Sequence, residues 1–245
     1  MWPDLESGYS VYRIFNDSEL ISLRNRINTQ IIDVLANCDP DAYQLLKNED
    51  DAISVYHKLG SKESHGSTWI KANRMLSDTD TAWLESTTSM KQLRYLLRWS
   101  RTSDELKLGR GNYYWRLTRP EAGNDVGPMH RDAWFWDLND DFGHDMTGLE
   151  RIKVWIAIET APGRNGLLVQ PGSHLRDDIQ WNSRRSGGIV KPVLATQLNP
   201  SSLVLLSPPP GHGVIFHDRL LHGGAPNSAD RCRCSLEFTF LVQAE

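Results

Sequence analysis

Three residues of types that bind metal ions, His130, Asp132 and His222, stand in two short segments of this 245-residue chain. His130 and Asp132 are separated by one residue, so in an extended segment their side chains project to the same side. Two imidazoles and one carboxylate on one face of a metal leave other coordination positions open, which is typical of non-haem Fe(II) sites. The pattern predicts such a metal site, with His130 opening a strand.

The residues near the C-terminus add weight to this pattern. An H-x-D pair arises easily by chance in a chain with eight histidines, so the pair alone is a weak indication. His222, however, is followed by two glycines and, eleven residues later, by Arg233. His217 is the alternative ligand, because it ends an apolar segment and is equally explained as a buried histidine without a metal. We favour His222, since the glycines let the backbone turn tightly beside a metal.

A C-terminal strand is predicted over residues 231–242, where apolar and polar residues alternate. Its apolar face is expected in the core. The polar face is either exposed to solvent, as in many antiparallel sheets, or lines the interior of a barrel. In a barrel, Arg233 and Ser235 would form a pair that binds a carboxylate, through two hydrogen bonds from the guanidinium and one from the hydroxyl.

From Gly111 to its end, the chain resembles the phytanoyl-CoA dioxygenase family of Fe(II)- and 2-oxoglutarate-dependent oxygenases. The matching motifs, in the family's order, are an aromatic strand ending in Arg119-Pro120, His130-x-Asp132, Val154-Trp155-Ile156-Ala157-Ile158, Asn165-Gly166-Leu167, Pro171-Gly172-Ser173-His174, His222-Gly223-Gly224 with Asn227, and Arg233. Several spaced motifs in one order are far more specific than any single motif. The resemblance implies a fold that is mainly β with supporting α-helices: a double-stranded β-helix, or jelly roll, of the cupin type.

The resemblance also implies roles for single residues. The residues expected to bind Fe(II) are His130, Asp132 and His222. The residues expected to contact 2-oxoglutarate are Arg233, Ser235, Trp155, Trp115 and Arg131. Of these, Arg233 would hold the C5 carboxylate. Trp115 is equally explained as an ordinary core tryptophan. Related halogenases have Gly or Ala at the position of Asp132, so halogenation is not expected.

The implied activity is O₂-dependent hydroxylation of an unactivated C–H bond in a small polar metabolite, with release of succinate and CO₂. Desaturation, epimerisation or ring closure would use the same metal ligands. Two other function classes remain open: a cupin-type metalloenzyme with non-oxidative chemistry, and a sugar-binding or inactive relative, which the nine tryptophans suggest. Neither of these two would form succinate from 2-oxoglutarate.

The surroundings of the substrate are less well indicated by the sequence. Residues 137–150 form a polar loop that is expected either to close over the site or to lie on the surface. The aromatic run 134–136 is expected to wall the pocket or to pack in the core. Arg151, Lys153 and Arg231 are candidates for holding an anionic or oxygen-rich molecule, the alternative being ion pairs on the surface.

Composition is consistent with a single catalytic domain over residues 1–245. Apolar residues at helical spacing over 17–35 and 79–99 predict helices, so residues 1–108 are expected to be mostly helical support and residues 109–245 the jelly-roll core. A net charge of −4 provides no basic surface for nucleic acid, and no apolar run is long enough for a membrane span. The N-terminus does not resemble a signal peptide and the three cysteines suit a reducing cytoplasm, whereas the oligomeric state is not indicated.

Overall fold

The computed structural model describes residues 4, 6–62, 65–102, 112–139, 145–186 and 189–244. The strands are β1 (Tyr9–Arg13), β2 (Trp99–Thr102), β3 (Tyr114–Thr118), β4 (Leu149–Glu159), β5 (Leu167–Val169), β6 (Trp181–Ser186), β7 (Ile189–Leu194), β8 (Val204–Leu206), β9 (His212–His217), β10 (His222–Gly224) and β11 (Arg233–Gln243). The α-helices are α1 (Asp17–Cys38), α2 (Pro40–Leu46), α3 (Ala52–Val55), α4 (His65–Thr68), α5 (Asp78–Ser86), α6 (Thr88–Leu96) and α8 (Ala133–Asp137). No helix among these residues has the length and apolar character needed to cross a bilayer.

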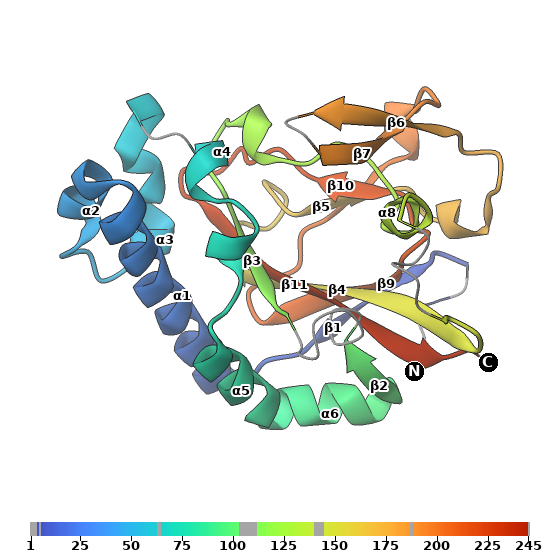
Figure 1. The fold of residues 1–245 in the computed structure, drawn as a ribbon, viewed down its shortest axis with the longest axis horizontal. Coiled ribbons are helices and arrows are strands. Elements are labelled where there is room, and N and C mark those ends of the chain that lie inside the picture. The colour runs from blue at the N-terminus through green and yellow to red at the C-terminus, as the bar shows by residue number, and fades with distance from the viewer. Residues whose placement is uncertain are drawn as a thin grey trace.

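A large antiparallel sheet occupies the middle of the molecule (Figure 1). Its strand order is β1-β9-β4-β11-β2, and β3 also pairs with β11. The two 11-residue strands, β4 and β11, pair along their length, and nearly all of their residues are buried whichever face they occupy. A strand can be buried on both faces only if another layer covers each face. Both faces of the sheet are therefore covered. We call the face under the smaller sheet the inner face and the face under the helices the outer face.

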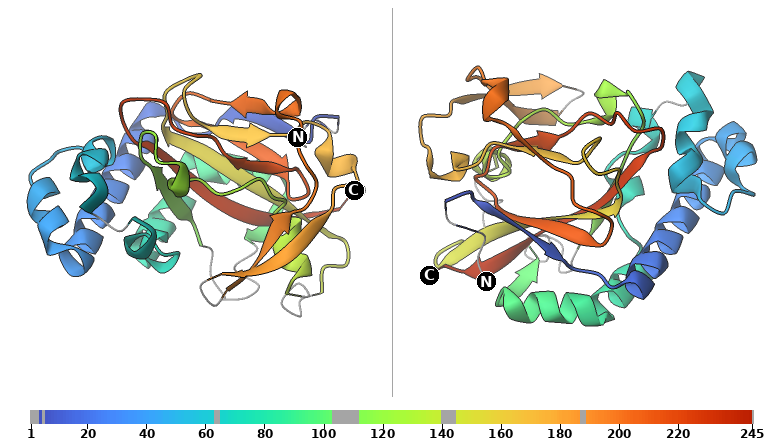
Figure 2. Two further views of the ribbon diagram at one scale, coloured as in Figure 1. Left: turned by 90° about the horizontal axis from the view of Figure 1, so that it is seen from above. Right: turned by 180° about the vertical axis from the view of Figure 1, so that it is seen from behind.

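The inner face of the large sheet is covered by a second, smaller sheet with the order β10-β5-β8, seen above it in Figure 1 and from other sides in Figure 2. A separate antiparallel pair, β6 and β7, lies beyond it. Two antiparallel sheets packed face to face are the layering of a jelly roll, which the predicted fold class requires. The fold class predicted from the sequence is thus confirmed.

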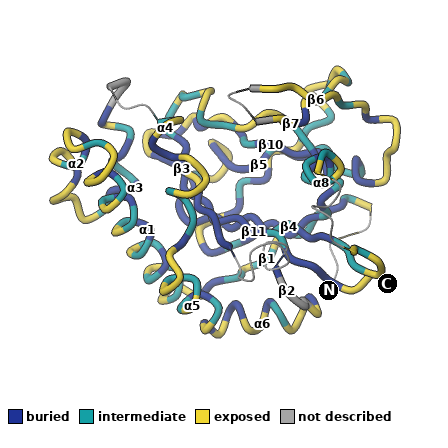
Figure 3. The backbone as a smooth tube through the Cα atoms, in the orientation of Figure 1, coloured by how far each residue is buried: buried dark blue, intermediate teal, exposed yellow. Residues whose placement is uncertain are grey.

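Helices cover the outer face of the large sheet (Figure 3). α1 begins where the side chain of Asn16 accepts a hydrogen bond from the backbone N–H of Glu19. A stripe of residues at every fourth position is fully buried, namely Leu23, Ile27, Ile31 and Leu35. This stripe shares one core with the outward-facing residues of β4 and β11. The predicted helix over residues 17–35 is confirmed, as is its supporting position against the sheet.

The second predicted helix, over residues 79–99, is wrong in two respects. It is interrupted at Thr87, whose backbone is extended and whose hydroxyl accepts a hydrogen bond from the N–H of Met90, so that α6 starts afresh. It also ends before β2, which pairs with β11. Because β1 lies before α1 and pairs with β9, the first part of the chain contributes strands as well as helices. The predicted boundary near residue 108 lies outside the described residues.

Candidate functional site

His130 and Asp132 lie beside His222, which is the first residue of β10. Their ligand atoms are all within 4.8 Å of one another, so the three side chains could hold a metal ion. Nε2 of His130 lies 3.4 Å from Oδ1 of Asp132, and Nε2 of His222 lies 3.9 Å from Oδ2. No other group of three such side chains is found in the part of the chain that the structure describes. The structure thus brings together the three residues that the sequence selected.

A backbone bridge joins the two segments that carry these residues. The N–H of His130 donates to the carbonyl of His222 over 2.8 Å, and the N–H of His222 donates back over 2.9 Å. After this bridge the chain turns, because Asp132 has helical dihedral angles and directly precedes α8. The predicted strand at His130 is therefore wrong. The imidazole of His130 and the carboxylate of Asp132 lie on one side because a helical turn follows a single bridge. Alternation along a strand does not place them there.

The two glycines after His222 allow close packing, and not the tight turn expected from the sequence. Both lie within the extended strand β10. A Cβ on Gly223 would lie 3.0 Å from the sulfur of Met129, and one on Gly224 would lie 3.1 Å from Cβ of Val126. Without side chains at these positions, residues 126–129 lie directly against β10, and this approach keeps His130 opposite His222.

A backbone carbonyl orients each histidine ring. Nδ1 of His130 is 2.8 Å from the carbonyl oxygen of Pro128, and Nδ1 of His222 is 2.9 Å from that of Leu220. A carbonyl oxygen can only accept, so Nδ1 carries the proton and the lone pair of Nε2 faces the cluster. This is the tautomer in which second contacts usually hold metal-binding histidines.

The charges in the cluster suit a divalent cation. Burial, and secondly the neighbouring His130, lowers the pKa of His222 to about 4, so this ring is neutral near pH 7. Burial alone would raise the pKa of Asp132, but Lys153 and the two histidines outweigh it and hold this pKa well below its ordinary value. A neutral imidazole and an ionised carboxylate are the forms that bind metal.

The lowered pKa of His222 predicts a pH dependence for the stability of the metal-free protein. The ring titrates near 6.5 when unfolded and at about 4 when folded, so between these values protons bind preferentially to the unfolded chain. The contribution is fully present above the unfolded pKa and is lost as the pH falls, by roughly 2 kcal/mol at pH 5. Chemical denaturation with a chelator present, at pH 7 and pH 5, should show a smaller fall for His222→Gln than for the unmodified protein. Equal falls would contradict the assignment.

Arg233 is buried on the inner face of β11, with 3% of its surface exposed. Its terminal nitrogens donate to the carbonyl oxygens of Gly166 and Ala225 and, over 2.8 Å, to the hydroxyl of Thr118. None of these partners is charged, and within the described residues no carboxylate pairs with Arg233. Burial, and secondly Arg116, lowers the pKa of Arg233 to about 10, so it remains a cation at neutral pH. A buried cation with no counter-charge is a favourable place for an anion.

Two buried polar atoms on β11 fit a bound carboxylate. Nε of Arg233 and Oγ of Ser235 have no hydrogen-bond partner within the described residues. The two residues are two positions apart on one strand and so share its inner face. A buried donor without a partner costs about 1–3 kcal/mol, which a carboxylate accepting from both would remove. The ring of Trp155 lies beside them, its centroid 5.9 Å from Cζ of Arg233.

Apolar contacts connect this carboxylate-binding part with the metal cluster. The ring of Phe216 lies 4.6 Å from the ring of His222, between centroids, and packs in the same buried cluster as Trp155. Ala225, whose carbonyl accepts from Arg233, follows shortly after His222 in the chain. Both parts of the site therefore lie between the same two sheets.

Trp115, expected against 2-oxoglutarate, lies on the opposite face of its strand. It pairs across β3 and β11 with Leu236, which belongs to the core beneath the helices, and is fully buried in that same core. Its Nε1 donates to Oε1 of Gln30 in α1 over 2.9 Å. Trp115 is therefore a core residue that joins the sheet to the helical layer, and its predicted contact with the cosubstrate is wrong.

Replacing Trp115 by phenylalanine should destabilise the protein without weakening 2-oxoglutarate binding. The variant loses the indole hydrogen bond, leaves Gln30 without its donor and removes packed ring atoms, which together cost about 1–3 kcal/mol. Denaturation and 2-oxoglutarate titration of the same variant measure both effects. A large loss of affinity with unchanged stability would return Trp115 to the cosubstrate site.

Arg131 is also placed away from the position expected for it, whereas Arg231 forms the surface ion pair that was the alternative for it. The guanidinium of Arg131 donates to the backbone carbonyls of Ser173 and Arg176, so it holds that turn and does not face the metal cluster. The side chain of Arg231 is 56% exposed and lies 3.5 Å from Glu159. Arg131 is therefore a structural residue, and Arg231 is part of a surface ion pair.

Arg116, Glu237 and Lys153 form a charged group on the inner face of the large sheet. Nε of Arg116 donates to Oε1 of Glu237, and Nζ of Lys153 lies 3.9 Å from Oε2 of Glu237 and 3.4 Å from Oδ2 of Asp132. Burial would raise the pKa of Glu237, but these two cations lower it to about 2. Only Lys153 was selected from the sequence as a residue of the site. Arg116 could have been found from its alternation with Thr118 on the aromatic strand.

The aromatic run of α8 divides between the core and the site. Trp134 is buried, whereas the ring of Phe135 contacts His130 at 5.6 Å between centroids. The ring of Trp136 lies 4.3 Å from Cζ of Arg151. Both sequence interpretations of this run therefore hold for part of it. Within the predicted 137–150 loop, residues 140–144 lie outside the described part of the chain.

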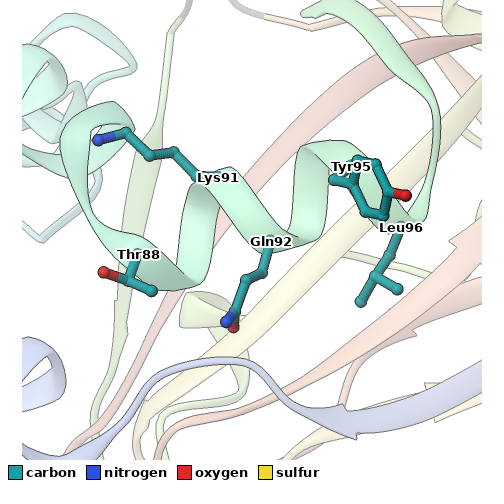
Figure 4. A pocket seen from close by; sticks show the side chains of 5 residues that line it. All are labelled: Thr88, Lys91, Gln92, Tyr95 and Leu96. Carbon is teal, nitrogen blue, oxygen red and sulfur yellow. The ribbon is translucent and has the colours of Figure 1, made fainter.

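A surface depression of about 460 Å³ on α6 is separate from this site (Figure 4). It is lined by Thr88, Lys91, Gln92, Tyr95 and Leu96. None of these side chains belongs to the metal cluster or to the inner face of the large sheet, so we assign no function to it.

Comparisons with known proteins agree with this geometry. The model of a family described as phytanoyl-CoA dioxygenase matches residues 47–235. Among solved structures, EvdO2 from Micromonospora carbonacea var. aurantiaca is 16% identical, with 98% of this chain and 89% of that chain covered and a TM-score of 0.58. EctD from S. alaskensis, solved with 2-oxoglutarate and 5-hydroxyectoine, is 16% identical over 97% of this chain and 73% of that chain, with a TM-score of 0.55. At such identities the likeness shows the fold, and no curated protein matches the sequence.

The family match extends over most of the chain and includes the metal cluster and Arg233. It favours an oxygenase over a cupin-type enzyme with non-oxidative chemistry and over a sugar-binding or inactive relative. Fe(II), 2-oxoglutarate and O₂ are the cofactor and cosubstrates of this family. The chain belongs to the phytanoyl-CoA dioxygenase family of Fe(II)- and 2-oxoglutarate-dependent oxygenases.

Proposed function

We propose that the chain hydroxylates an unactivated C–H bond of a small polar metabolite, with His130, Asp132 and His222 as the protein ligands of Fe(II). When bound, Fe(II), 2-oxoglutarate and O₂ supply the oxidation and release succinate and CO₂. Two features between the same two sheets carry the proposal: a cluster that could hold a metal ion, and a buried Arg233 that pairs with no carboxylate among the described residues.

The C5 carboxylate of 2-oxoglutarate is held by Arg233 and Ser235. Nε of Arg233 and Oγ of Ser235 are free to donate, while Thr118 and two backbone carbonyls hold the guanidinium in place. Trp155 borders the guanidinium and excludes water from this end of the site. A charge-assisted pair in a dry site is stronger than the same pair in water.

At the metal, the protein orients its ligands and limits access of water. The carbonyl contacts at Nδ1 fix both imidazoles with Nε2 toward the cluster. Phe135 and Phe216 pack against the two rings. The carboxylate of Asp132 fills the position that halogenases leave open, which favours hydroxylation over halogenation.

Anaerobic titration of the Fe(II)-loaded protein with 2-oxoglutarate tests the cofactor assignment. We expect the weak visible charge-transfer band of an iron-bound keto acid, and its absence in Asp132→Ala. Succinate release in air, followed across a panel of small polar metabolites with product analysis by mass spectrometry, then tests hydroxylation. Iron-loaded protein without the band, or turnover that yields only dehydrogenated or rearranged products, would contradict the respective part of the proposal.

We also propose that the chain acts as one catalytic domain in the cytoplasm. The helices and the outer face of the large sheet share one continuous core, so neither layer has a separate interior. Cys232, just before β11, and Cys234, within it, are buried thiols that form no disulfide, which suits a reducing compartment.

A further inference from the structure

The group formed by Arg116, Glu237 and Lys153 has one more positive charge than negative charge. Under the proposed function the other charges of the site would balance separately. Bound Fe(II) would compensate Asp132 and one carboxylate of 2-oxoglutarate, and Arg233 would compensate the C5 carboxylate. Glu237 can compensate only one of its two cations. The side chain of Lys153 is only 15% exposed, and a cation with so little contact with water is unfavourable without a counter-charge. An anion is therefore expected beside this group.

Both cations of the group retain donors for such an anion. Arg116 uses Nε for Glu237, and its two terminal nitrogens have no partner within the described residues, although its side chain is 46% exposed. Lys153 has three donors, and its two acidic neighbours lie at the long distances of 3.4 Å and 3.9 Å. Arg116 and Lys153 thus keep donors that Glu237 does not use.

The group also borders the metal cluster, which is where a substrate must lie. Nζ of Lys153 is next to Oδ2 of Asp132, and the charge of Asp132 contributes to raising the pKa of Arg116, after the larger effect of Glu237. Strand register keeps the group in place, since Glu237 stands opposite Tyr114 on one side and Trp155 on the other. The unpaired charge is therefore at the metal end of the inner face.

We propose that Arg116 and Lys153, held by Glu237, bind a carboxylate of the substrate, which makes the substrate class small organic acids. The proposal rests on the proposed function. The planar guanidinium of Arg116 can give a carboxylate two parallel hydrogen bonds, and Lys153 adds a point charge. One carboxylate cancels the excess charge of Arg116, Lys153 and Glu237; the nearby Arg74 already donates to the backbone carbonyls of Trp69 and Trp115.

Matched acids and amides test the proposal in the full chain loaded with Fe(II) and 2-oxoglutarate without O₂. The probes are benzoate with benzamide, cyclohexanecarboxylate with its amide, and phenyl phosphate, followed by thermal stability and by changes in the charge-transfer band. We expect each acid to bind roughly tenfold to a hundredfold more tightly than its amide. Arg116→Gln should abolish this preference and Arg116→Lys should retain part of it. Arg13→Gln, which removes an exposed arginine from β1, should leave it intact.

Three results would overturn the proposal: amides that bind as well as the acids, no binding of any acid, or tighter binding of phenyl phosphate than of benzoate. A fourth is weaker binding of 2-oxoglutarate itself in Arg116→Gln with the acid preference unchanged, which would assign the group to the cosubstrate. Failure of the proposed function is seen separately, because the unmodified protein would then show no charge-transfer band before any probe is added.

Discussion

Replacing His222 by alanine should reduce the affinity for Fe(II) by more than about a hundredfold, whereas His217→Ala should leave it nearly unchanged. Loss of a residue that only supports a metal ligand typically costs tenfold to a hundredfold, and loss of a ligand should cost more. His222 is within the cluster and 5% exposed. His217 instead contacts Asp218 at 3.1 Å and accepts a hydrogen bond from the backbone N–H of Arg219.

The two histidine variants form a matched pair, because each removes one imidazole from the same stretch of chain. Iron content after anaerobic loading and gel filtration, together with Co(II) titration, measures the affinity. Denaturation curves check that each variant is folded. Equal metal content in the two variants would contradict the assignment of His222. Loss only in His217→Ala would make His217 the ligand.

Arg233→Gln should weaken 2-oxoglutarate binding by about a hundredfold while iron binding stays intact. Truncating one partner of a buried, hydrogen-bonded charge pair costs 2–5 kcal/mol, and the amide of glutamine cannot supply the charge. The metal-free fold should tolerate the change, since it removes a buried cation that forms no ion pair among the described residues. The effect is therefore expected on cosubstrate affinity and not on stability.

Arg231→Gln is the control for this variant. It removes the same charge from a neighbouring position, but from a side chain that is half exposed and paired with Glu159. Anaerobic titration should give the unmodified affinity for 2-oxoglutarate. If Arg231→Gln lost affinity and Arg233→Gln kept it, the anchor of the cosubstrate would be the exposed arginine and the inner face of β11 would have another use.

His130, Asp132 and His222 could be selected from residue type and order in the sequence. The backbone conformation that brings them together could not be predicted in this way. The spacing of His130 and Asp132 suits a strand, and only the structure shows a single bridge followed by a helical turn. Alternation along β11 correctly separated Arg233 and Ser235 from the core face, because the strand is long and regular. Short patterns with no tertiary information selected side chains that the structure brings together, but they did not predict the local conformation.

The errors at Trp115 and Arg131 have a common physical cause. Which face of a short strand is buried against helices depends on its register with a neighbour, and the pairing of Trp115 with Leu236 cannot be read from either segment alone. The guanidinium of Arg131 is long enough to reach carbonyls on a distant turn, at Ser173 and Arg176. The same limit hid the ion pair between Arg116 and Glu237, which joins two strands far apart in the sequence.

The bridge between His130 and His222 also bears on when the enzyme can take up its metal. The ligands come from segments far apart in the chain, and they meet only after the smaller sheet has formed and residues 126–129 have packed on β10. Such long-range contacts form late, because the chain between them must first be closed into a loop. We therefore expect iron to be loaded into an already folded chain. Bound iron would then stabilise the folded state without guiding folding, so copies made under iron limitation should fold fully and remain ready for later activation.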